Sequence, residues 1–509
     1  MSIVIDGATL SVDEVAAIAR QREAVSLSRE AEAAIHKARA YVEKKLEKGE
    51  AIYGLTTGFG KFQDTFVTPD NAKRLQYNLI ISHACAMGDP LSDDVARAML
   101  ALRINAVAKG YSGIKLSTVQ TMMNMLNLGV TPVVPSKGSL GASGDLALLA
   151  HMTMPMIGEG EAFYGGERMN GRAAMEMAGI PVIELESKEG LALINGTQAM
   201  CAIGALVLYD ATVLAKTADV LAAMCCEAQL GIRKAFDPKI QSVRGHRGQI
   251  ESASNLMKLL KDSKLAADSN PDKVQDAYSV RCTPQIHGGS REAMRYVRNL
   301  LTREINAATD NPLIFVDEDE VISGGNFHGQ PVAIALDTLG IAIAEFANVS
   351  ERRLERLVNP ALSNGLPAFL SMEGGLNNGM MIMQYVAASM VSENKIYAHP
   401  ASVDSIPSSA NQEDHVSMGT TAAHTARLIV DNARRVLALE LLAECQALSL
   451  RGAELMAPAT RAVFDCVRAA GVPVVDGDIF LQPEILKCEA LIADGSVCAA
   501  AEAVCGRLL

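Results

Sequence analysis

Long runs of this chain place apolar residues three and four positions apart, with polar residues between them. This spacing predicts helices that bury one face, because residues three and four apart lie on the same side of a helix. The runs are rich in alanine, leucine and methionine and cover residues 28–48, 93–109, 116–128, 197–230, 290–308, 332–357, 384–396, 420–450 and 457–470. At 1.5 Å per residue, runs such as 332–357 and 420–450 measure about 40 Å, which favours a helix bundle that continues across an oligomer interface.

Strand patterns are few and short. They occur at residues 2–6, 132–135, 181–186 and 314–323. Near the N-terminus, Ser11 and Glu14 form a capping-box pattern that predicts a helix through about Arg20. We therefore expect a mainly α fold: a long antiparallel helix bundle with a mixed, mostly helical N-terminal portion and a few short β hairpins.

The chain shows no internal repeat and no low-complexity linker, so it divides only loosely. We expect an N-terminal portion at residues 1–195, a central long-helix bundle at 196–450 and a C-terminal helical extension at 451–509. Residues 231–289 form the longest segment predicted to be irregular. Long loops of this kind tend to be functional.

Charge and composition exclude several classes of partner. The formal net charge of −12 disfavours nucleic acid, whose binding depends on lysine and arginine side chains that neutralise phosphates. The N-terminus carries early acidic residues and no basic segment before an apolar run, so we expect a cytoplasmic protein. Residues 190–209 and 374–392 are uncharged but contain asparagine and glutamine, and we interpret both as buried helices and not as membrane spans.

Metal binding is not expected either. The ten cysteines form no CxxC pair and no spacing with histidine that suits zinc, so free and mostly buried thiols are predicted. His328, Glu413, Asp414 and His415 are individually plausible ligands, but no H-E-x-x-H or similar spacing is present.

The densest glycine cluster lies in 137-KGSLGASGDLALLAHM-152, which runs directly into an apolar segment. It does not fit G-x-S-x-G, because Gly144 follows Ser143 directly and Asp145 takes the last position. Neither G-x-G-x-x-G nor the phosphate-binding G-x-x-x-x-G-K-[ST] is present. A plain loop before a helix and a chemically active loop therefore remain as alternatives.

The chemical interpretation concerns Ala142, Ser143 and Gly144. The backbone nitrogen of Gly144 can attack the carbonyl carbon of Ala142, and loss of one water from the ring and one from Ser143 leaves an exocyclic methylidene. Gly144 lets the backbone fold back, Ala142 keeps the entrance to the ring small, and Ser143 supplies the hydroxyl that leaves. The product would be an electrophile made from the chain itself.

Here the sequence resembles the histidine and phenylalanine ammonia-lyase family, whose members carry this 4-methylideneimidazol-5-one (MIO) group within G-S-x-G-A-S-G-D-L-A. Leu148 and Ala277 depart from the pattern, where family members often have proline, and neither removes a reactive group. The resemblance also rests on seven further blocks spread along nearly the whole chain: 53-YGLTTGFG-60, 82-SHA-84, 189-EGLALINGTQ-198, 273-KVQDAYSVRC-282, 310-DNPL-313, 324-GGNFHGQP-331 and 409-SANQEDHVSM-418.

The resemblance implies non-oxidative loss of ammonia from an α-amino acid, with no external cofactor. It gives Tyr53 the role of general base and places Tyr278 beside the prosthetic group as the rival for proton transfer. A tyrosine with an ordinary pKa near 10 is a poor base at neutral pH, so its neighbours would have to lower its pKa. A buried tyrosine with a satisfied hydroxyl is the alternative for Tyr53.

Three residues are expected to bind substrate. Arg281 suits bidentate capture of a carboxylate, although a surface arginine without a function is its common alternative. Asn195 is a polar residue within an apolar run, and it either caps its own helix or holds the ring carbonyl and the substrate. Phe327 would pack near the electrophile or belong to the core.

Specificity is expected from His83, Gln275 and Glu413. A carboxylate facing an imidazole forms a charge-assisted hydrogen bond, and a pocket that donates and accepts hydrogen bonds rejects phenyl analogues. We therefore expect L-histidine as substrate and trans-urocanate and ammonia as products. A tyrosine or phenylalanine ammonia-lyase or an aminomutase is the alternative within the family.

A helical scaffold that has lost activity is the alternative from another class. It predicts loss of Ser143, Tyr53 or Arg281, and all three residues are present. The resemblance finally implies a homotetramer in which each active site is shared between chains, in agreement with the helix lengths.

Overall fold

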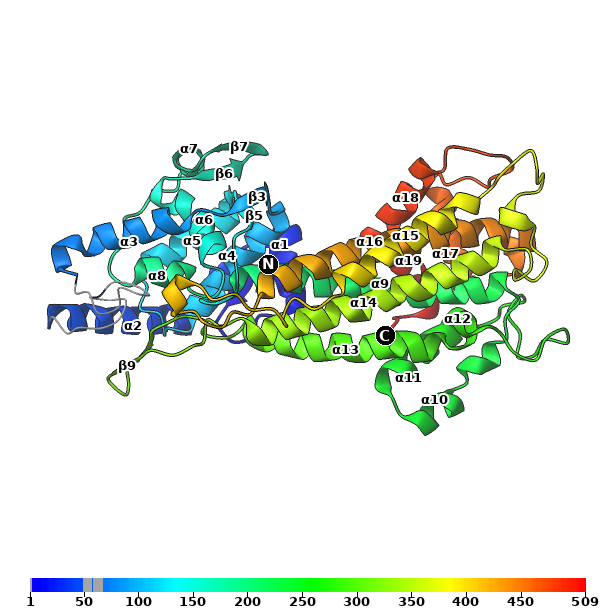
Figure 1. The fold of residues 1–509 in the computed structure, drawn as a ribbon, viewed down its shortest axis with the longest axis horizontal. Coiled ribbons are helices and arrows are strands. Elements are labelled where there is room, and N and C mark those ends of the chain that lie inside the picture. Colours follow the sequence, from blue (N-terminus) through cyan, green and yellow to red (C-terminus); the bar gives the residue numbers. More distant parts are fainter. Residues whose placement is uncertain (1, 49–56, 58–66) are drawn as a thin grey trace. The chain divides into compact units, whose positions relative to one another are not determined.

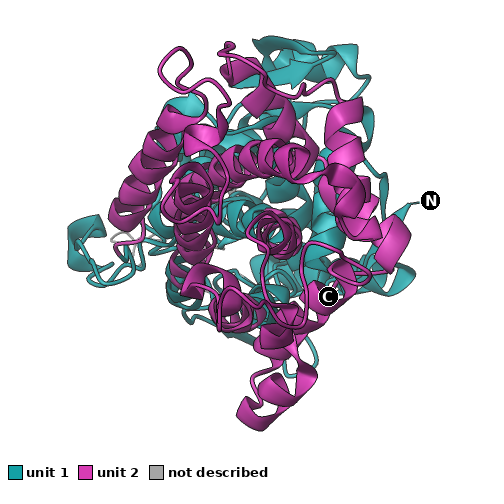
Figure 2. Ribbon diagram, turned by 90° about the vertical axis from the view of Figure 1, so that its right-hand side faces the viewer, with its two compact units in different colours: residues 1–209, 297–337, 400–424 teal, residues 210–296, 338–399, 425–509 magenta. Residues whose placement is uncertain are grey.

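The computed structural model describes residues 2–48, 57 and 67–509. Within these residues the protein is mainly helical, as predicted, and its strands are two to four residues long. The chain forms two compact units, each drawn from three segments (Figure 2). Unit 1 consists of residues 1–209, 297–337 and 400–424, and unit 2 of residues 210–296, 338–399 and 425–509. The predicted division at residues 195 and 450 separates portions that are continuous in sequence, whereas each compact unit combines three separate segments. The predicted division therefore stays a prediction.

Unit 1 contains all the sheets of the described chain (Figure 1). Strands β1 and β2 pair in parallel, β3 pairs with β5, β6 lies between β4 and β7, and β8 and β9 form a hairpin. The elements are β1 Ile3–Ile5, α1 Val12–Arg20, β2 Val25–Leu27, α2 Arg29–Glu47, α3 Pro69–His83, β3 Met87–Pro90, α4 Asp93–Ala108, α5 Leu116–Leu128, β4 Thr131–Pro132, β5 Pro135–Lys137, α6 Leu146–Thr153, β6 Glu161–Tyr164, β7 Glu167–Asn170, α7 Gly171–Met177, α8 Glu189–Ile194, β8 Leu313–Phe315 and β9 Glu320–Ile322.

Unit 2 is helical throughout its described elements. It contains α10 Pro238–Arg244, α11 Arg247–Leu259, α12 Tyr278–Arg281, α15 Met381–Tyr397, α17 Pro458–Ala469, α18 Gln482–Ala493 and α19 Ser496–Cys505. Four long helices have residues in both units: α9 Gln198–Ala228, α13 Thr283–Glu304, α14 Gln330–Val358 and α16 Gly419–Arg451. Their unit 2 parts run alongside one another (Figure 1).

Local sequence explains many helix boundaries. The capping box at α1 is present: the Ser11 hydroxyl accepts from the Glu14 amide, and the Glu14 carboxylate accepts from the Ser11 amide. Helices α2, α9, α14 and α16 begin and end within two residues of their predicted bounds. The strand predicted at residues 2–6 and the hairpin at 314–323 are likewise confirmed.

Several predictions were wrong. Residues 181–186 form no strand, and the segment 231–289 contains α10, α11 and α12. Helix α13 begins at Thr283 and not near Ser290, because Pro284 is tolerated in a first turn. Gly288 is needed there for close helix packing, since an added Cβ would lie 2.5 Å from the Gln249 amide nitrogen of α11.

The two uncharged stretches differ from each other. Residues 190–208 are buried across α8 and α9, as predicted, and Tyr209 is half-buried. The stretch 374–392 becomes helical only at Met381, and its Tyr385 side chain is 60% exposed. By length and apolar composition alone, α9 and α14 could cross a membrane, but 78% and 67% of their most apolar windows are buried inside the protein.

Candidate active site

The glycine-rich loop is folded tightly against the end of α8. Gly141 and Gly144 have φ angles of +69° and +75°, in the left-handed region that favours glycine. A Cβ added to Gly144 would lie 2.1 Å from the Gly196 carbonyl oxygen, so no other residue fits there without moving the backbone. The next amide, that of Asp145, donates to the same Gly196 carbonyl at 2.8 Å. The loop geometry therefore requires glycine where the sequence has it.

Asp145 anchors this loop from a wholly buried position. Its Oδ2 accepts from the amides of Ala199 and Met200, both at 2.9 Å, in the first turn of α9. Its Oδ1 accepts from the hydroxyls of Ser139 at 2.7 Å and Thr420 at 2.5 Å. Burial raises the pKa of this carboxyl, and the four hydrogen bonds oppose that rise. Asp145 thus ties the loop to α9 and α16, a role that its sequence context alone did not indicate.

Ser143 lies between two of the predicted site residues. Its hydroxyl donates to Oε1 of Glu413 at 2.6 Å, and its carbonyl oxygen accepts from Nδ2 of Asn195 at 2.9 Å. Asn195 is 4% exposed and directly follows α8, so its amide is directed at the loop and does not cap its own helix through the side chain. Three segments far apart in sequence therefore meet at one serine.

Glu413 is positioned by its own loop. Ser408 donates its hydroxyl to Oε2 of Glu413 at 2.9 Å, and the two residues also exchange backbone hydrogen bonds. Of its two carboxylate oxygens, one thus contacts Ser143 and the other Ser408. The pair fixes the carboxylate beside the glycine-rich loop.

His83 ends α3 and is half-buried. Burial lowers the pKa of its imidazole, while a hydrogen bond with the Leu79 backbone and the charge of Glu413 act to raise it. The Nδ1 atom lies 3.1 Å from the Ser82 hydroxyl. A neutral imidazole has one donor and one acceptor nitrogen, so His83 can form hydrogen bonds of either sense.

Arg103 donates to the backbone carbonyl of Asn195 and so helps to position this residue. Arg103 was not identified from the sequence. Its guanidinium donates to the carbonyls of Ala192 at 2.7 Å and Asn195 at 2.9 Å, and to Oε1 of Gln198 at 3.0 Å. Burial lowers the pKa of Arg103 to about 10, against the favourable charge of Asp310. The hydrogen bonds fix the turn between α8 and α9 that carries Asn195.

Phe327 is half-buried in the turn before α14. The adjacent His328 ring stacks on that of His415, with centroids 5.8 Å apart and planes inclined by 2°, and its Nε2 lies 3.2 Å from the His415 carbonyl oxygen. His415 follows two residues after Glu413. This contact joins the turn at Phe327 to the loop that carries the carboxylate.

The remaining predicted residues are not brought to Ser143 within unit 1. Tyr278, Arg281 and Gln275 belong to unit 2, where Tyr278 is 69% exposed and Gln275 is exposed. The Arg281 guanidinium lies 4.7 Å above the Tyr278 ring, and its buried Nε has no hydrogen-bond partner among the described residues. Tyr53 lies outside the described residues.

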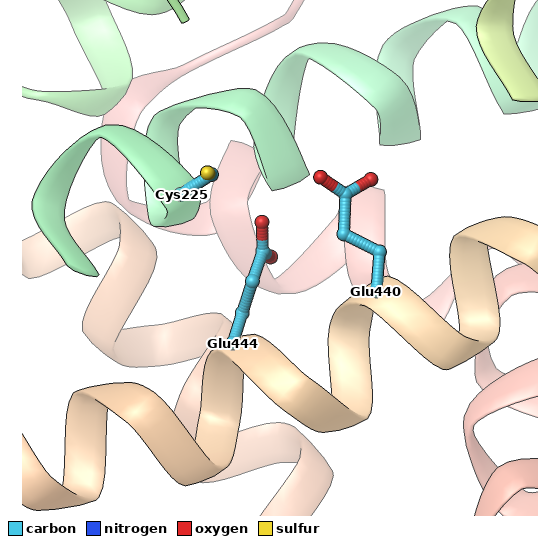
Figure 3. A group of neighbouring side chains, drawn as sticks. All are labelled: Cys225, Glu440 and Glu444. Carbon is cyan, nitrogen blue, oxygen red and sulfur yellow. The ribbon is translucent and has the colours of Figure 1, made fainter. Parts of the chain in front are cut away.

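One group of possible metal ligands occurs in unit 2, among the described residues (Figure 3). Cys225 of α9 and Glu440 and Glu444 of α16 are wholly buried, and their ligand atoms lie within 4.8 Å of one another. Glu440 already pairs with Arg353 and accepts from the Ser350 hydroxyl at 2.5 Å. Burial and the neighbouring charge of Glu440 raise the pKa of Glu444 well above 4.5. A proton on Glu444 therefore accounts for the group without a metal.

This proton predicts a pH effect on stability. The pKa of Glu444 is higher in the folded state than in the unfolded state. The stabilisation of the fold by protonated Glu444 is therefore complete below about pH 4.5 and is lost as the pH rises through the folded-state pKa. Glu444→Gln keeps the shape of the side chain but cannot ionise. When the pH is raised from about 5 to about 8, we expect the free energy of unfolding of the variant to increase by at least about 1 kcal/mol relative to that of the wild type. Urea unfolding of both proteins at the two pH values measures these free energies. A difference between variant and wild type that is the same at both pH values would contradict the prediction.

Comparisons with known proteins point to one family. A family model described as aromatic amino acid lyase matches residues 10–469. The chain is 54% identical over 502 residues to a histidine ammonia-lyase from Symbiobacterium thermophilum, with 99% of each chain covered. It is similar to the crystal structure of histidine ammonia-lyase from Trypanosoma cruzi, with a TM-score of 0.93, 42% identity and coverage of 99% and 96%. It is also similar to tyrosine aminomutase from Streptomyces globisporus, with a TM-score of 0.95, 35% identity and 99% of each chain covered.

Proposed function

The chain belongs to the aromatic amino acid lyase family, and on this premise we propose that it is a histidine ammonia-lyase. As a carbon–nitrogen lyase it removes ammonia from L-histidine without oxidation and gives trans-urocanate, the first step of histidine degradation. The observation that carries this proposal is the hydrogen bond between Ser143 and Glu413, because it sets a carboxylate beside the serine of the Ala142-Ser143-Gly144 loop.

The loop fits conversion to the MIO group. Gly144 already has a left-handed φ that only a residue without Cβ adopts easily, and Ala142 is buried against Val416 and Met418. Asn195 donates to the Ser143 carbonyl, which becomes the ring carbonyl after cyclisation. No external cofactor is required, since all ring atoms come from Ala142, Ser143 and Gly144.

Once formed, the MIO group supplies an electrophile that can turn the substrate amine into a better leaving group. The other residues bind and orient the substrate or move protons. Asn195 and Arg281 hold the carboxylate, because an amide donor and a planar guanidinium suit its two oxygens. Tyr53 removes the β-proton, with Tyr278 as its rival, and Phe327 covers the site.

His83, Gln275 and Glu413 provide the specificity for histidine. The imidazole of histidine offers one donor and one acceptor, and Glu413 and His83 can satisfy both. Phenylalanine would leave the Glu413 carboxylate without a partner, and such unpaired groups reject an analogue strongly. A tyrosine ammonia-lyase or aminomutase remains the alternative, since His83 can also bind a phenol hydroxyl.

The residues of unit 2 support a shared site in a homotetramer. Tyr278 presents an exposed aromatic ring, and Arg281 a buried donor without a partner among the described residues, which suits completion by another subunit. Helix α15 also exposes large apolar side chains along one side: Ile382 at 52%, Tyr385 at 60% and Ile396 at 67%. Exposed apolar patches mark interaction surfaces, so α15 is a candidate subunit interface.

We also propose a cytoplasmic location. All ten cysteines are free, including Cys225 and Cys226, which are adjacent in sequence and buried. Thiols that remain free are typical of a reducing compartment.

Replacing His83 with leucine tests the assignment of histidine as substrate. We expect kcat/KM for L-histidine to fall roughly 100-fold, because one hydrogen-bonding partner of the imidazole is lost. We expect kcat/KM for L-phenylalanine to stay constant or to rise. Steady-state kinetics with both amino acids measures the two values.

His36→Leu is the matched control, since His36 is exposed on α2. We expect this variant to leave both values unchanged. If His83→Leu changed neither value, or lowered both equally, His83 would not select the substrate and the specificity proposal would fail.

A further inference from the structure

The Ser143 hydroxyl must leave for the MIO group to form. The same hydroxyl forms a hydrogen bond with Glu413. The two oxygens are 2.6 Å apart, a short separation for an O–H···O hydrogen bond. In its carboxyl form, Glu413 can donate its own proton to Ser143 Oγ across the same contact without any movement. The contact places an acid at the leaving group before any substrate is present.

Asp145, the acidic residue of the loop itself, is occupied elsewhere. Both oxygens of Asp145 accept hydrogen bonds, from two α9 amides and the hydroxyls of Ser139 and Thr420. Asn195 contacts the Ser143 carbonyl and not its hydroxyl. Glu413 is also held in place, since Ser408 donates to its second oxygen.

We propose that Glu413 is the general acid that protonates the departing hydroxyl of Ser143 when the chain forms its own prosthetic group. The inference rests on the proposed function and adds a role in maturation to the substrate-binding role of Glu413. Hydroxide is a poor leaving group, and protonation as the bond breaks converts it to water.

The step balances as follows in atoms and electrons. The Cα–H bond of Ser143 breaks and its electron pair forms the Cα=Cβ double bond, while the Cβ–Oγ bond breaks and its pair leaves on oxygen. The oxygen takes the proton of Glu413 and departs as water. The Cα proton passes to solvent water, which also returns a proton to Glu413, so the net change is the loss of one water.

Glu413→Gln tests this role, because glutamine keeps the size and a hydrogen bond to Ser143 Oγ but has no proton to transfer. We expect loss of the second water to be roughly 100-fold slower, the usual contribution of a general acid. Full-length variant would then accumulate with the mass of one lost water, located by peptide mass in the segment 138–152. Intact-mass spectrometry at fixed times after a pulse of synthesis follows this without any activity assay.

Two further variants serve as controls. Glu413→Asp keeps a transferable proton and should restore part of the second water loss. His36→Leu changes an exposed residue of α2 and should lose both waters at the wild-type rate. Circular dichroism checks that each variant keeps its helix content.

The outcomes separate this inference from the proposed function. Glu413→Gln chains that lose two waters at the wild-type rate would overturn the inference, and chains that lose neither would overturn it too, since the defect would then lie in ring closure. Arrest of His36→Leu at the same stage would overturn it as well, since the block would then not depend on Glu413. A wild-type chain that never loses two waters would instead contradict the proposed function.

Discussion

Replacing Ser143 with alanine is expected to lower the rate of ammonia release from L-histidine by at least about a thousand-fold, or about 4 kcal/mol of transition-state stabilisation. Alanine has no hydroxyl to lose, so the chain cannot form the methylidene electrophile. The fold should be unaffected, because the Ser143 side chain forms one hydrogen bond among the described residues, the one to Glu413. The measurement is the steady-state rate of urocanate formation, with the intact mass of the same sample.

Ser242→Ala is the control for this variant, since Ser242 is exposed on α10 and bonds to a backbone carbonyl of its own helix. It should keep full activity and lose two waters. If Ser143→Ala retained more than about a tenth of the wild-type rate, catalysis would not depend on the loop.

Replacing Asp219 with asparagine should give the largest loss of stability. Asp219 of α9 is wholly buried and accepts from the Arg291 guanidinium at 2.6 Å and from His287 Nδ1 at 2.7 Å, both on α13. The asparagine side chain would be neutral and would leave the charge of Arg291 buried without a counter-ion, which costs about 3 to 5 kcal/mol. The urea midpoint of unfolding measures this loss.

The loss should also depend on pH. Burial acts to raise the pKa of Asp219, but the charge of Arg291 and the hydrogen bonds from His287 and Ser252 outweigh it and hold the pKa at about 2, below the ordinary 3.8. The stabilisation is therefore complete above about 3.8 and disappears as the pH falls through 2. The difference in free energy of unfolding between the wild type and Asp219→Asn should therefore become smaller as the pH falls over this range.

Asp465→Asn is the matched control, because Asp465 pairs with Arg461 on the surface of α17. Exposed pairs contribute little, so this variant should lose less than about 1 kcal/mol. Equal losses for Asp219→Asn and Asp465→Asn would contradict the view that the buried ion pair is a main support of unit 2.

The sequence predicted those parts of the structure that depend on local pattern. The long helices follow from apolar residues three and four apart, and the loop of Gly141 and Gly144 follows from a local density of glycine. Asn195 stood out because an amide inside an apolar run must find a partner, and it contacts the Ser143 carbonyl.

Other features depend on contacts between distant segments and could not be predicted. Asp145 reads as an ordinary residue before a helix, but burial against α9 and α16 makes it the anchor of the loop. Arg103 lies inside a buried helix, and only the fold brings the Asn195 carbonyl to it. The start of α13 was missed because Gly288 is selected for packing against α11 and not for helix propensity.

The most direct test adds L-histidine, L-tyrosine and L-phenylalanine separately to the purified wild-type protein, without any added cofactor. The ultraviolet absorbance of each conjugated product is then measured over time. We expect urocanate from histidine alone, from protein whose intact mass lacks two waters. Coumarate from tyrosine with no product from histidine would contradict the substrate assignment. No product from any of the three, from protein that retains both waters, would contradict the chemistry as well.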